Sequence, residues 1–399
     1  MRTITECRSC GGAIKEFLDL GVQYTSDFRL DDSKTPAYPI VAVLCDVCKL
    51  VQLRDTTPSH EMYHDNYGFK SGVSNSIKED LEDNVKNALE FKPKAKNWLD
   101  IASNDGTLLS YVPKNIHRVG VDPITKYCEL AVEHADKIVN DFFKADLLPY
   151  YKFDVITSIS CFYDMDDPNK FVGDVAQVLD DEGVWVIQQN YLLPTMELNA
   201  VDNFCHEHLE YYTLLSMEPL LERHGLEVID LSTSMVNGGS LRTIVAHKGK
   251  FPVHDAVVHQ RTIEKTAGLD TEEPYNRFAK DVWKNLKELK LFVKDAKKDS
   301  KTVAILAAST RGATIWQAAG IGQDDVMFAV ERNPEKVGKY FNAIGVPIVS
   351  EETEREVKPD YMIVGPWFFA QEIIDREKDY IDSGGALVIP LPKLEIIKK

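Results

Sequence analysis

Short apolar runs alternate with helical or loop stretches from Asn97 onward, and this alternation restricts the possible folds more than any other feature. The first four runs, each expected to form a strand, are WLDIA, RVGVD, DVITSIS and VWVIQQN. Such alternation is typical of a mostly parallel, doubly wound sheet with helices on both faces. The central part of the chain is therefore expected to be an α/β domain.

The alternation breaks near residue 250 and restarts after residue 300, where TVAILAA, VMFAVE, YMIVG and GALVIPL are the apolar runs. The stretch Pro274–Lys298 between them has apolar residues on one face and lysines on the other, which predicts a long amphipathic helix. A helix is also expected over Ser74–Phe91. We expect four parts: a cysteine-bearing module at 1–75, a first α/β domain at 76–250, a helical linker at 251–299 and a second, Rossmann-like α/β domain at 300–399.

The composition is that of a soluble globular protein, with 44% hydrophobic and 27% charged residues among 399. No apolar run approaches the roughly 18 residues that span a bilayer, and the N-terminus lacks a signal-peptide core. We therefore expect a cytoplasmic protein without a membrane partner. A net charge of −17 argues against nucleic acid as a partner, although a local basic pocket can still hold a small phosphorylated ligand.

Four of the seven cysteines form two close pairs, Cys7-x-x-Cys10 and Cys45-x-x-Cys48. Two such turns can supply the four sulfurs of a tetrahedral Zn²⁺ site, and a reducing compartment favours metal over disulfides. A site closed by four thiolates has no open position for a substrate. We predict structural zinc; unrelated thiols or a redox pair are the alternatives.

The first α/β domain opens with a strand that runs into the turn 102–106, ASNDG, and then into an apolar helix. A small, glycine-bearing turn lets the backbone approach a ligand at a helix N-terminus. Dinucleotide-binding turns carry three glycines, whereas this turn has only Gly106, which favours S-adenosylmethionine (SAM) over NAD.

An acid and an aromatic residue follow the next two strands. Asp122 lies where a carboxylate accepts hydrogen bonds from ribose hydroxyls, and Asp141 with Phe142 can hold an adenine. The bland alternative is that these are ordinary turn residues of an α/β domain. The predicted cofactor-binding residues are Asp100, Ala102, Asn104, Asp105, Gly106, Asp122, Asp141, Phe142 and Ser160.

In its order of motifs, the whole chain resembles the sugar C-methyltransferase family, which acts on nucleotide-linked keto-deoxysugars. The motifs are CRSCGG (7–12), LDLG (18–21), CDVCKLVQL (45–53), ASNDG (102–106), HEH (206–208), NGGSLR (237–242) and ERNP (331–334). The resemblance implies a zinc module, a central class I SAM-methyltransferase sheet and a C-terminal Rossmann-like domain that binds the nucleotide.

The resemblance also implies an active site at the His-Glu-His segment, with His208 as the base and Glu207 assisting. Imidazole titrates near neutrality, which suits the removal of a proton next to a ketone to form an enolate. His206, Tyr211 or Asn190 can donate a hydrogen bond to the enolate oxygen. Two positions depart from the family: Cys205 stands where a Tyr is usual, and Asp164 where a His is usual.

Several further residues are candidates for substrate binding. The 237–242 segment can close over a substrate or form a plain hairpin turn, and the segment after Ala308 places hydroxyls and an Arg at a helix N-terminus, which suits a phosphate. The acid of the ERNP motif can bind a ribose or cap a helix. The predicted substrate-binding residues are Asn190, Tyr211, Asn237, Arg242, Ser309, Arg311, Gly312, Glu331 and Arg332.

Two other functions stay open on the sequence alone. The chain could transfer the SAM methyl group to oxygen or nitrogen of another small molecule, or it could be a non-enzymatic protein whose zinc module contacts a partner. The preferred hypothesis is a SAM-dependent methyltransferase with a nucleotide-linked sugar as small-molecule substrate, acting as a monomer or homodimer.

Overall fold

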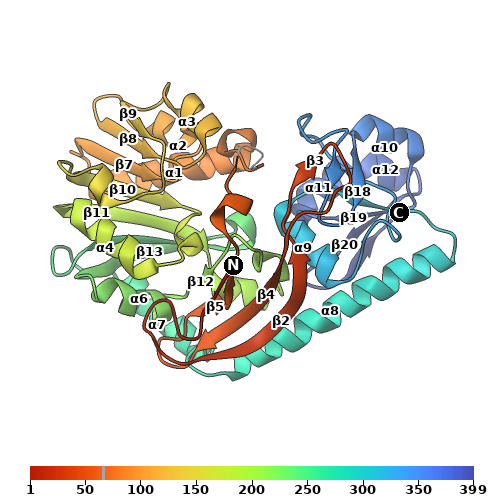
Figure 1. The fold of residues 1–399 in the computed structure, drawn as a ribbon, viewed down its shortest axis with the longest axis horizontal. Helices are drawn as coiled ribbons and strands as arrows, with labels where there is room; N and C mark the ends of the chain where they lie inside the picture. The colour runs from red at the N-terminus through yellow and green to blue at the C-terminus, as the bar shows by residue number, and fades with distance from the viewer. Residues whose placement is uncertain (65–67) are drawn as a thin grey trace.

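In the computed structural model, which describes residues 1–64 and 68–399, two mostly parallel sheets form two lobes, as Figure 1 shows. The first lobe contains a seven-stranded sheet of order β13-β14-β11-β10-β7-β8-β9, in which β14 alone runs antiparallel to its neighbours. Its strands are β7 (Asn97–Ile101), β8 (His117–Val121), β9 (Lys137–Val139), β10 (Phe153–Ile159), β11 (Leu179–Asn190), β13 (Leu226–Ser234) and β14 (Ser240–His247). The predicted doubly wound sheet is confirmed.

Two polar residues in the middle of β10 show how this sheet is buried on both faces. The Oγ1 of Thr157 accepts a hydrogen bond from the Trp98 indole at 3.1 Å, and the Oγ of Ser158 accepts one from the Trp185 indole at 3.0 Å. Successive strand residues point to opposite faces, so each tryptophan closes a different side of the sheet. Both indoles are fully buried, and burial of an indole N–H requires such a partner.

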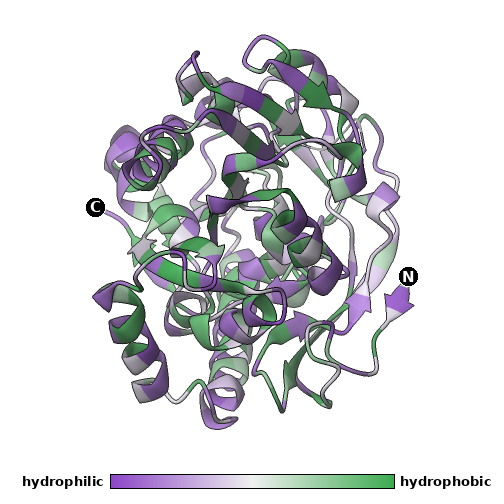
Figure 2. Ribbon diagram, turned by 90° about the vertical axis from the view of Figure 1, so that its left-hand side faces the viewer, coloured by the Kyte–Doolittle hydropathy of each residue, from purple (hydrophilic) through white to green (hydrophobic). Residues whose placement is uncertain are grey.

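The helices of the first lobe lie on both faces of this sheet. They are α1 (Asn75–Phe91), α2 (Thr107–Tyr111), α3 (Thr125–Ala131), α4 (Pro168–Val178), α5 (Leu192–Glu197), α6 (Leu214–Glu222) and α7 (Asp255–Thr266). The two that the sequence predicts individually, α1 and α2, are present. The predicted long helix is α8 (Glu273–Lys298), whose buried face carries Phe278, Val282, Leu286 and Val293. Figure 2 shows the resulting alternation of hydrophobic and hydrophilic residues along the helices.

The second lobe has its own sheet, of order β21-β20-β19-β15-β16-β18-β17-β3. Its strands from the C-terminal part of the chain are β15 (Val303–Leu306), β16 (Ala329–Val330), β17 (Tyr340–Phe341), β18 (Val346–Val349), β19 (Tyr361–Val364), β20 (Ala386–Ile389) and β21 (Glu395–Ile397). The helices are α9 (Thr310–Ala318), α10 (Glu351–Val357), α11 (Ala370–Arg376) and α12 (Lys378–Asp382). The core strands from β18 to β20 are parallel, as a Rossmann-like domain requires.

The N-terminal strands join both lobes, which no sequence pattern indicated. A four-stranded sheet of order β12-β5-β4-β2 takes β12 from the first lobe, and β3 completes the sheet of the second lobe by pairing with β17. In Figure 1 the long β2 and β4 ribbon runs between the lobes. These strands are β1 (Arg2–Thr3), β2 (Ile14–Tyr24), β3 (Phe28–Arg29), β4 (Ala37–Cys45), β5 (Val51–Leu53), β6 (Asp55–Thr56) and β12 (Glu210–Tyr211). The boundaries between the four predicted parts stay a prediction.

Among the helices of residues 1–64 and 68–399, none combines the length and the apolar character that crossing a bilayer demands. The longest, α8, has lysines along its exposed side.

Replacing Phe341 with Ala is expected to lower the free energy of unfolding by about 3–5 kcal/mol, the usual effect of truncating a fully buried Phe. Its ring packs against that of Phe28 with 5.6 Å between centroids, so the change also loosens the β3 and β17 pair. Chemical denaturation of the variant measures the effect. Leu30→Ala, at a side chain that is 81% exposed, is the control and should leave stability unchanged.

Candidate functional site

The two Cys-x-x-Cys turns meet at one point, where four thiols come within 4.8 Å of one another. Cys7 and Cys48 sulfurs are 3.6 Å apart, and Cys10 and Cys45 sulfurs are 3.4 Å apart. Four sulfurs at 2.3 Å from a tetrahedral zinc ion would be separated by about 3.8 Å. The spacing of the thiols therefore fits Zn²⁺.

Backbone and amide N–H groups surround these sulfurs, as they do around bound thiolates. The Cys45 sulfur accepts from the N–H groups of Val47 and Cys48 at 3.4 Å each. The Cys7 sulfur accepts from Gln52 Nε2 at 3.2 Å. These donors stabilise negative charge on the thiols, which is the form that binds a metal.

The turn after β7 has the tight backbone that its sequence predicts. Ala102, Asn104 and Gly106 have φ values of 59°, 49° and 78°. A Cβ at Gly106 would lie 2.9 Å from the Ala131 Cα, so a glycine is needed there both for space and for its left-handed conformation. The turn thus brings backbone close to α3 at the carboxyl edge of the sheet, where ligands bind in this fold.

A cavity of about 570 Å³ opens at this edge of the sheet. Ala102, Asp141 and Phe142, all predicted to bind the cofactor, line it. Asp122 lies between two lining residues, and its oxygens accept from the N–H groups of Asn104 at 2.9 Å and Ile124 at 2.8 Å. Burial raises the pKa of Asp122, and these two hydrogen bonds partly offset that effect.

Other predicted cofactor residues support the cavity from behind. Asp100 is buried within β7 and accepts a hydrogen bond from Thr157 Oγ1 at 2.7 Å; burial raises its pKa to about 7. The side chains of Asn104 and Asp105 accept from the backbone N–H groups of Ser71 and Gly72, at 3.0 and 3.1 Å. They fasten the segment before α1 to the turn.

Ser160, the last predicted cofactor residue, turns the chain at the end of β10. Its φ is 56°, and its N–H donates to the Gln188 carbonyl at 2.7 Å. Cys161 and Asp164, just beyond it, line the cavity. Direct contact with a cofactor by each of the nine predicted residues stays a prediction.

The His-Glu-His segment lies beside this cavity, and its two histidine rings contact different parts of the protein. Leu209, the next residue, lines the cavity and donates its N–H to the Tyr163 carbonyl at 2.8 Å. The His208 ring packs on the Tyr163 ring with 4.3 Å between centroids. The His206 ring instead contacts the Tyr38 carbonyl of β4 through Nε2 at 3.2 Å, on the ribbon side.

His208 has a fixed orientation. Its Nδ1 lies 2.9 Å from the Asn203 carbonyl oxygen, so the neutral ring donates from Nδ1 and keeps its lone pair on Nε2. Burial lowers the pKa of His208 to about 3, and the positive charge of Arg311 adds to that effect. Burial also lowers the pKa of His206, to about 4.

Two buried carboxyl groups next to this segment, those of Asp164 and Glu207, influence each other electrostatically. Burial and then the charge of Glu207 raise the pKa of Asp164 well above its ordinary value. Burial also raises the pKa of Glu207, whose hydrogen bond with Cys205 acts the other way. Burial is the first cause of the high pKa of Cys205, so its thiol stays protonated.

Asn190 and Tyr211 hold the loop that carries His208. Asn190 Nδ2 donates to Asn203 Oδ1 at 2.9 Å, and the Tyr211 hydroxyl donates to the His208 carbonyl at 2.9 Å. An amide has a second N–H, so Asn190 retains one donor for another partner.

Arg311 links the second lobe to the same loop. Its Nη2 lies 2.6 Å from Asp202 Oδ2, its Nη1 donates to the Asn237 carbonyl at 2.7 Å, and its guanidinium stacks on Phe368. Asp202 is 1% exposed. Breaking such a buried ion pair on one side is costly, so Arg311 fixes the position of the 201–203 turn.

The remaining predicted substrate residues already have partners inside the protein. Arg242 donates to Gln188 Oε1 at 3.0 Å and to Asp83 Oδ2 at 2.7 Å. The Ser309 hydroxyl accepts from Gly312 N–H at 3.0 Å and so caps α9. Their roles toward a substrate stay predictions.

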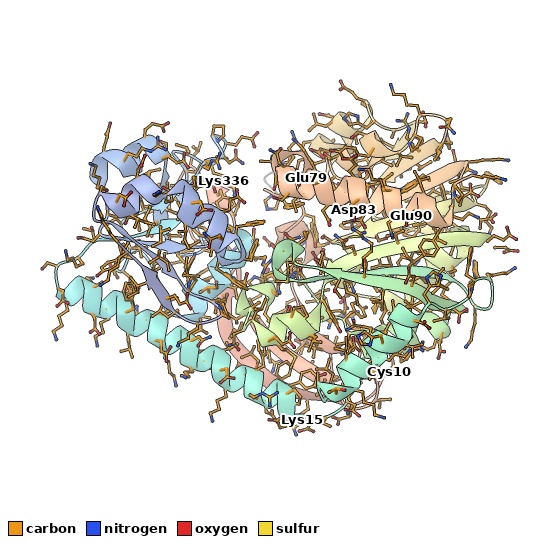
Figure 3. The ribbon with its side chains drawn as sticks, turned by 180° about the vertical axis from the view of Figure 1, so that it is seen from behind. Cys10, Lys15, Glu79, Asp83, Glu90 and Lys336 are labelled. Atoms are coloured by element: carbon orange, nitrogen blue, oxygen red, sulfur yellow. The ribbon has the colours of Figure 1, made fainter. Side chains whose placement is uncertain are left out.

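A second cavity, of about 1050 Å³, lies between the lobes. Glu331, Arg332 and Lys336 line it from the second lobe, and Lys126 lines it from α3. Glu331 Oε1 accepts from the N–H groups of Arg332 and Asn333 and holds that turn. Figure 3 shows Lys336 on the side of the second lobe that faces Glu79 at the start of α1.

One whole wall of the first cavity comes from residues that no sequence pattern singled out. Thr56, Thr57, Pro58, Ser59, Met62 and Tyr63, all from the N-terminal part, line it opposite the β7 turn. The Tyr63 ring meets the Phe142 ring edge-on, with 6.3 Å between centroids. These residues form no motif, and the pairing of β6 with β1 and of β5 with β12 helps to bring them to the cavity.

Three family models match successive parts of the chain. The model described as "Putative zinc binding domain" matches residues 7–63, "Methyltransferase domain" matches residues 75–231, and "C-methyltransferase C-terminal domain" matches residues 235–392. The matched ranges contain the thiol cluster, most of the seven-stranded sheet and most of the second lobe, respectively.

A curated relative matches the chain over its whole length. C-methyltransferase NovU of Streptomyces niveus is 27% identical over 413 residues, which are 100% of this chain and 98% of the relative. Among solved structures, an S-adenosylmethionine-dependent methyltransferase of Clostridium acetobutylicum covers 45% of this chain and 94% of its own, at 15% identity and a TM-score of 0.37. The plantazolicin methyltransferase BpumL in complex with SAH covers 43% and 84%, at 16% identity and a TM-score of 0.34.

Replacing Cys45 with Ser is expected to remove most of the bound zinc, because an uncharged hydroxyl replaces one of four thiolates. Elemental analysis of the purified variant measures the zinc content against about one ion per wild-type chain. Cys128→Ser is the matched control: its thiol lies by the Asp122 carbonyl, outside the cluster, and a hydroxyl can donate there equally well. Full zinc content in Cys45→Ser would refute the assignment.

Proposed function

This chain is a SAM-dependent methyltransferase that fits the sugar C-methyltransferase family, and we propose that it methylates a carbon next to the ketone of a nucleotide-linked keto-deoxysugar. Its fold class is the expected one: a class I SAM-methyltransferase sheet with a four-cysteine zinc module. SAM and Zn²⁺ are the expected cofactors. The non-enzymatic alternative is not supported by these matches.

The observation that carries the proposal is the placement of His208. It lies next to a residue of the first cavity, beside the turn that follows β10, and a backbone carbonyl fixes its Nδ1. Its Nε2 is then the basic nitrogen, and its lowered pKa keeps the ring neutral at physiological pH. A neutral, oriented imidazole is the form that can accept a proton from carbon.

When bound, SAM supplies an electrophilic methyl group on a sulfonium. In the proposed reaction His208 Nε2 takes the proton from the carbon beside the ketone, and the electrons of that C–H bond form an enolate. The enolate carbon then bonds to the methyl group as the methyl–sulfur bond breaks, which leaves S-adenosylhomocysteine and a protonated His208. The base must lose this proton to solvent before the next turnover.

The enolate oxygen needs a hydrogen-bond donor, and two groups near His208 can supply one. A carboxyl of the Asp164 and Glu207 pair that keeps its proton is a donor, because like charges in a buried pair prevent both from ionising. The second N–H of Asn190 is the other. In this chain Asp164 and Cys205 thus replace the family's usual His and Tyr with a protonated acid and a neutral thiol.

The nucleotide part of the substrate would occupy the cavity between the lobes. That cavity is lined by Lys126, Arg332 and Lys336 in a protein whose net charge is −17, so it concentrates positive charge where the rest of the surface is acidic. Basic side chains from both sides suit a diphosphate. Arg311, which contacts Asp202 and lies close enough to affect His208, joins this lobe to the base.

Replacing His208 with Gln is expected to reduce turnover by about 100-fold or more while SAM still binds, because the amide cannot accept the proton. Solvent-deuterium exchange into the acceptor separates the mechanisms: the wild type should exchange the proton beside the ketone, and the variant should not. Transfer without exchange would favour oxygen or nitrogen as the methylated atom.

The matched control is His259→Gln, at an exposed position of α7, which should keep the wild-type rate. A His208→Gln variant that also kept the wild-type rate would remove His208 from the base role. S-adenosylhomocysteine binding, measured by calorimetry, verifies that either variant still forms the cofactor site.

The rate should also depend on pH in a way set by the lowered pKa of His208. A base loses activity as pH falls through its pKa, so turnover should stay level from pH 8 down to about pH 5. Arg311→Gln removes a positive charge that disfavours the protonated ring, and should move the acidic limb to higher pH. Wild-type activity that halves near the ordinary histidine pKa of about 6.5 would contradict the assignment.

A further inference from the structure

We infer that residues 55–63 of the zinc module form part of the cofactor site, so that zinc occupancy sets the affinity for SAM. Zinc in a closed four-thiolate site is otherwise expected only to hold its own module together. Six residues of this segment line the cavity at the carboxyl edge of the methyltransferase sheet: Thr56, Thr57, Pro58, Ser59, Met62 and Tyr63.

The segment supplies the wall that the sheet itself lacks. Thr57 and Met62 are buried, and Tyr63 meets Phe142 edge-on to close an aromatic corner. An aromatic corner with an adjoining apolar methionine suits the adenine ring of the cofactor. The opposite wall contains Ala102 and Asp141, so the cofactor would lie between the two modules.

A continuous path of hydrogen bonds joins this wall to the metal ligands. Gln52 donates from Nε2 to the Cys7 sulfur at 3.2 Å and accepts at Oε1 from the Arg8 N–H at 3.0 Å. Arg8 Nη2 donates to the Thr56 hydroxyl at 2.7 Å, and that hydroxyl donates to Asp166 Oδ1 at 2.8 Å. Thr56 and Asp166 both line the cavity.

Arg8 is the central residue of this path. Its side chain is fully buried, and its Nη1 also donates to the Leu53 carbonyl. A buried guanidinium requires all of its partners in place, so movement of the Cys7 turn displaces Thr56 as well. Without zinc the cysteine turns lose the bonds that hold them together, and the wall loses its support.

Coupling between two binding sites is reciprocal, and this supplies a direct test on the unmodified protein. S-adenosylhomocysteine, used as the probe, should raise the affinity for zinc by about fivefold or more. Equilibrium competition with a chromogenic chelator measures this affinity. Equal zinc affinities with and without saturating probe would overturn the inference.

Arg8→Gln tests the route, because it keeps all four cysteines and removes the bond to Thr56. Calorimetry with S-adenosylhomocysteine should show affinity about fivefold weaker or more, and the probe should no longer raise the affinity for zinc. Lys34→Gln is the matched control: it also removes a positive charge from the zinc module, at an exposed side chain that donates to the Tyr24 hydroxyl, and its affinity should stay at the wild-type value.

Unchanged affinity in Arg8→Gln, or an effect of the probe on zinc affinity that persists there, would show that the wall does not depend on this path and would overturn the inference. Both readouts measure binding without turnover. They therefore stand apart from the identity of the methyl acceptor and from the role of His208.

Discussion

Four thiols packed within one small turn region can be buried together only if a cation neutralises the charge they acquire, and this constraint shapes the rest of the molecule. The cysteine turns fix where β4 ends and β5 begins. Cys45 is the last residue of β4, and only two residues separate Cys48 from the first residue of β5. β5 then accepts β12 from the methyltransferase lobe as a neighbour. The metal site thus fixes the position of β5, the strand that pairs with β12 directly after the His-Glu-His segment.

The proposed active site gathers its members from three directions. The turn after β10 supplies Asp164, the segment just before β12 supplies His208, and the second lobe supplies Arg311. Burial keeps His208 neutral and raises the pKa of the carboxyl pair at the same time. These opposite shifts leave the imidazole without a proton and favour a protonated carboxyl group near neutral pH.

Much of the fold follows from patterns that are local in sequence. The strands β7, β8, β10 and β11, the long amphipathic α8 and the left-handed turn at Gly106 all come from periodicity and from one residue type with special backbone freedom. The four cysteine ligands were equally predictable, because their spacing is set by the geometry of the metal.

What the sequence could not predict depends on residues that meet across long separations. Arg242 and Ser309 are predicted substrate-binding residues, and the structure adds partners for them inside the protein, at Asp83 and Gly312. Thr57 and Met62 belong to no motif of the sequence, yet they line a cavity. The local sequence pattern around a residue does not indicate which distant segment it will contact. Its contacts, and therefore its place in a cavity, can be assigned only from the packed structure.

The pairing of β3 with β17 has a consequence for how the protein is made. Asn342 holds the 29–33 region through its side chain, accepting from the Arg29 N–H and donating to the carbonyls of Asp31 and Ser33. About 300 residues separate these partners, so a ribosome must release nearly the whole polypeptide before the first hairpin finds its neighbour. Until then β3 is an unpaired strand edge on the growing chain. Such edges are prone to aggregate, and chaperones counter that aggregation.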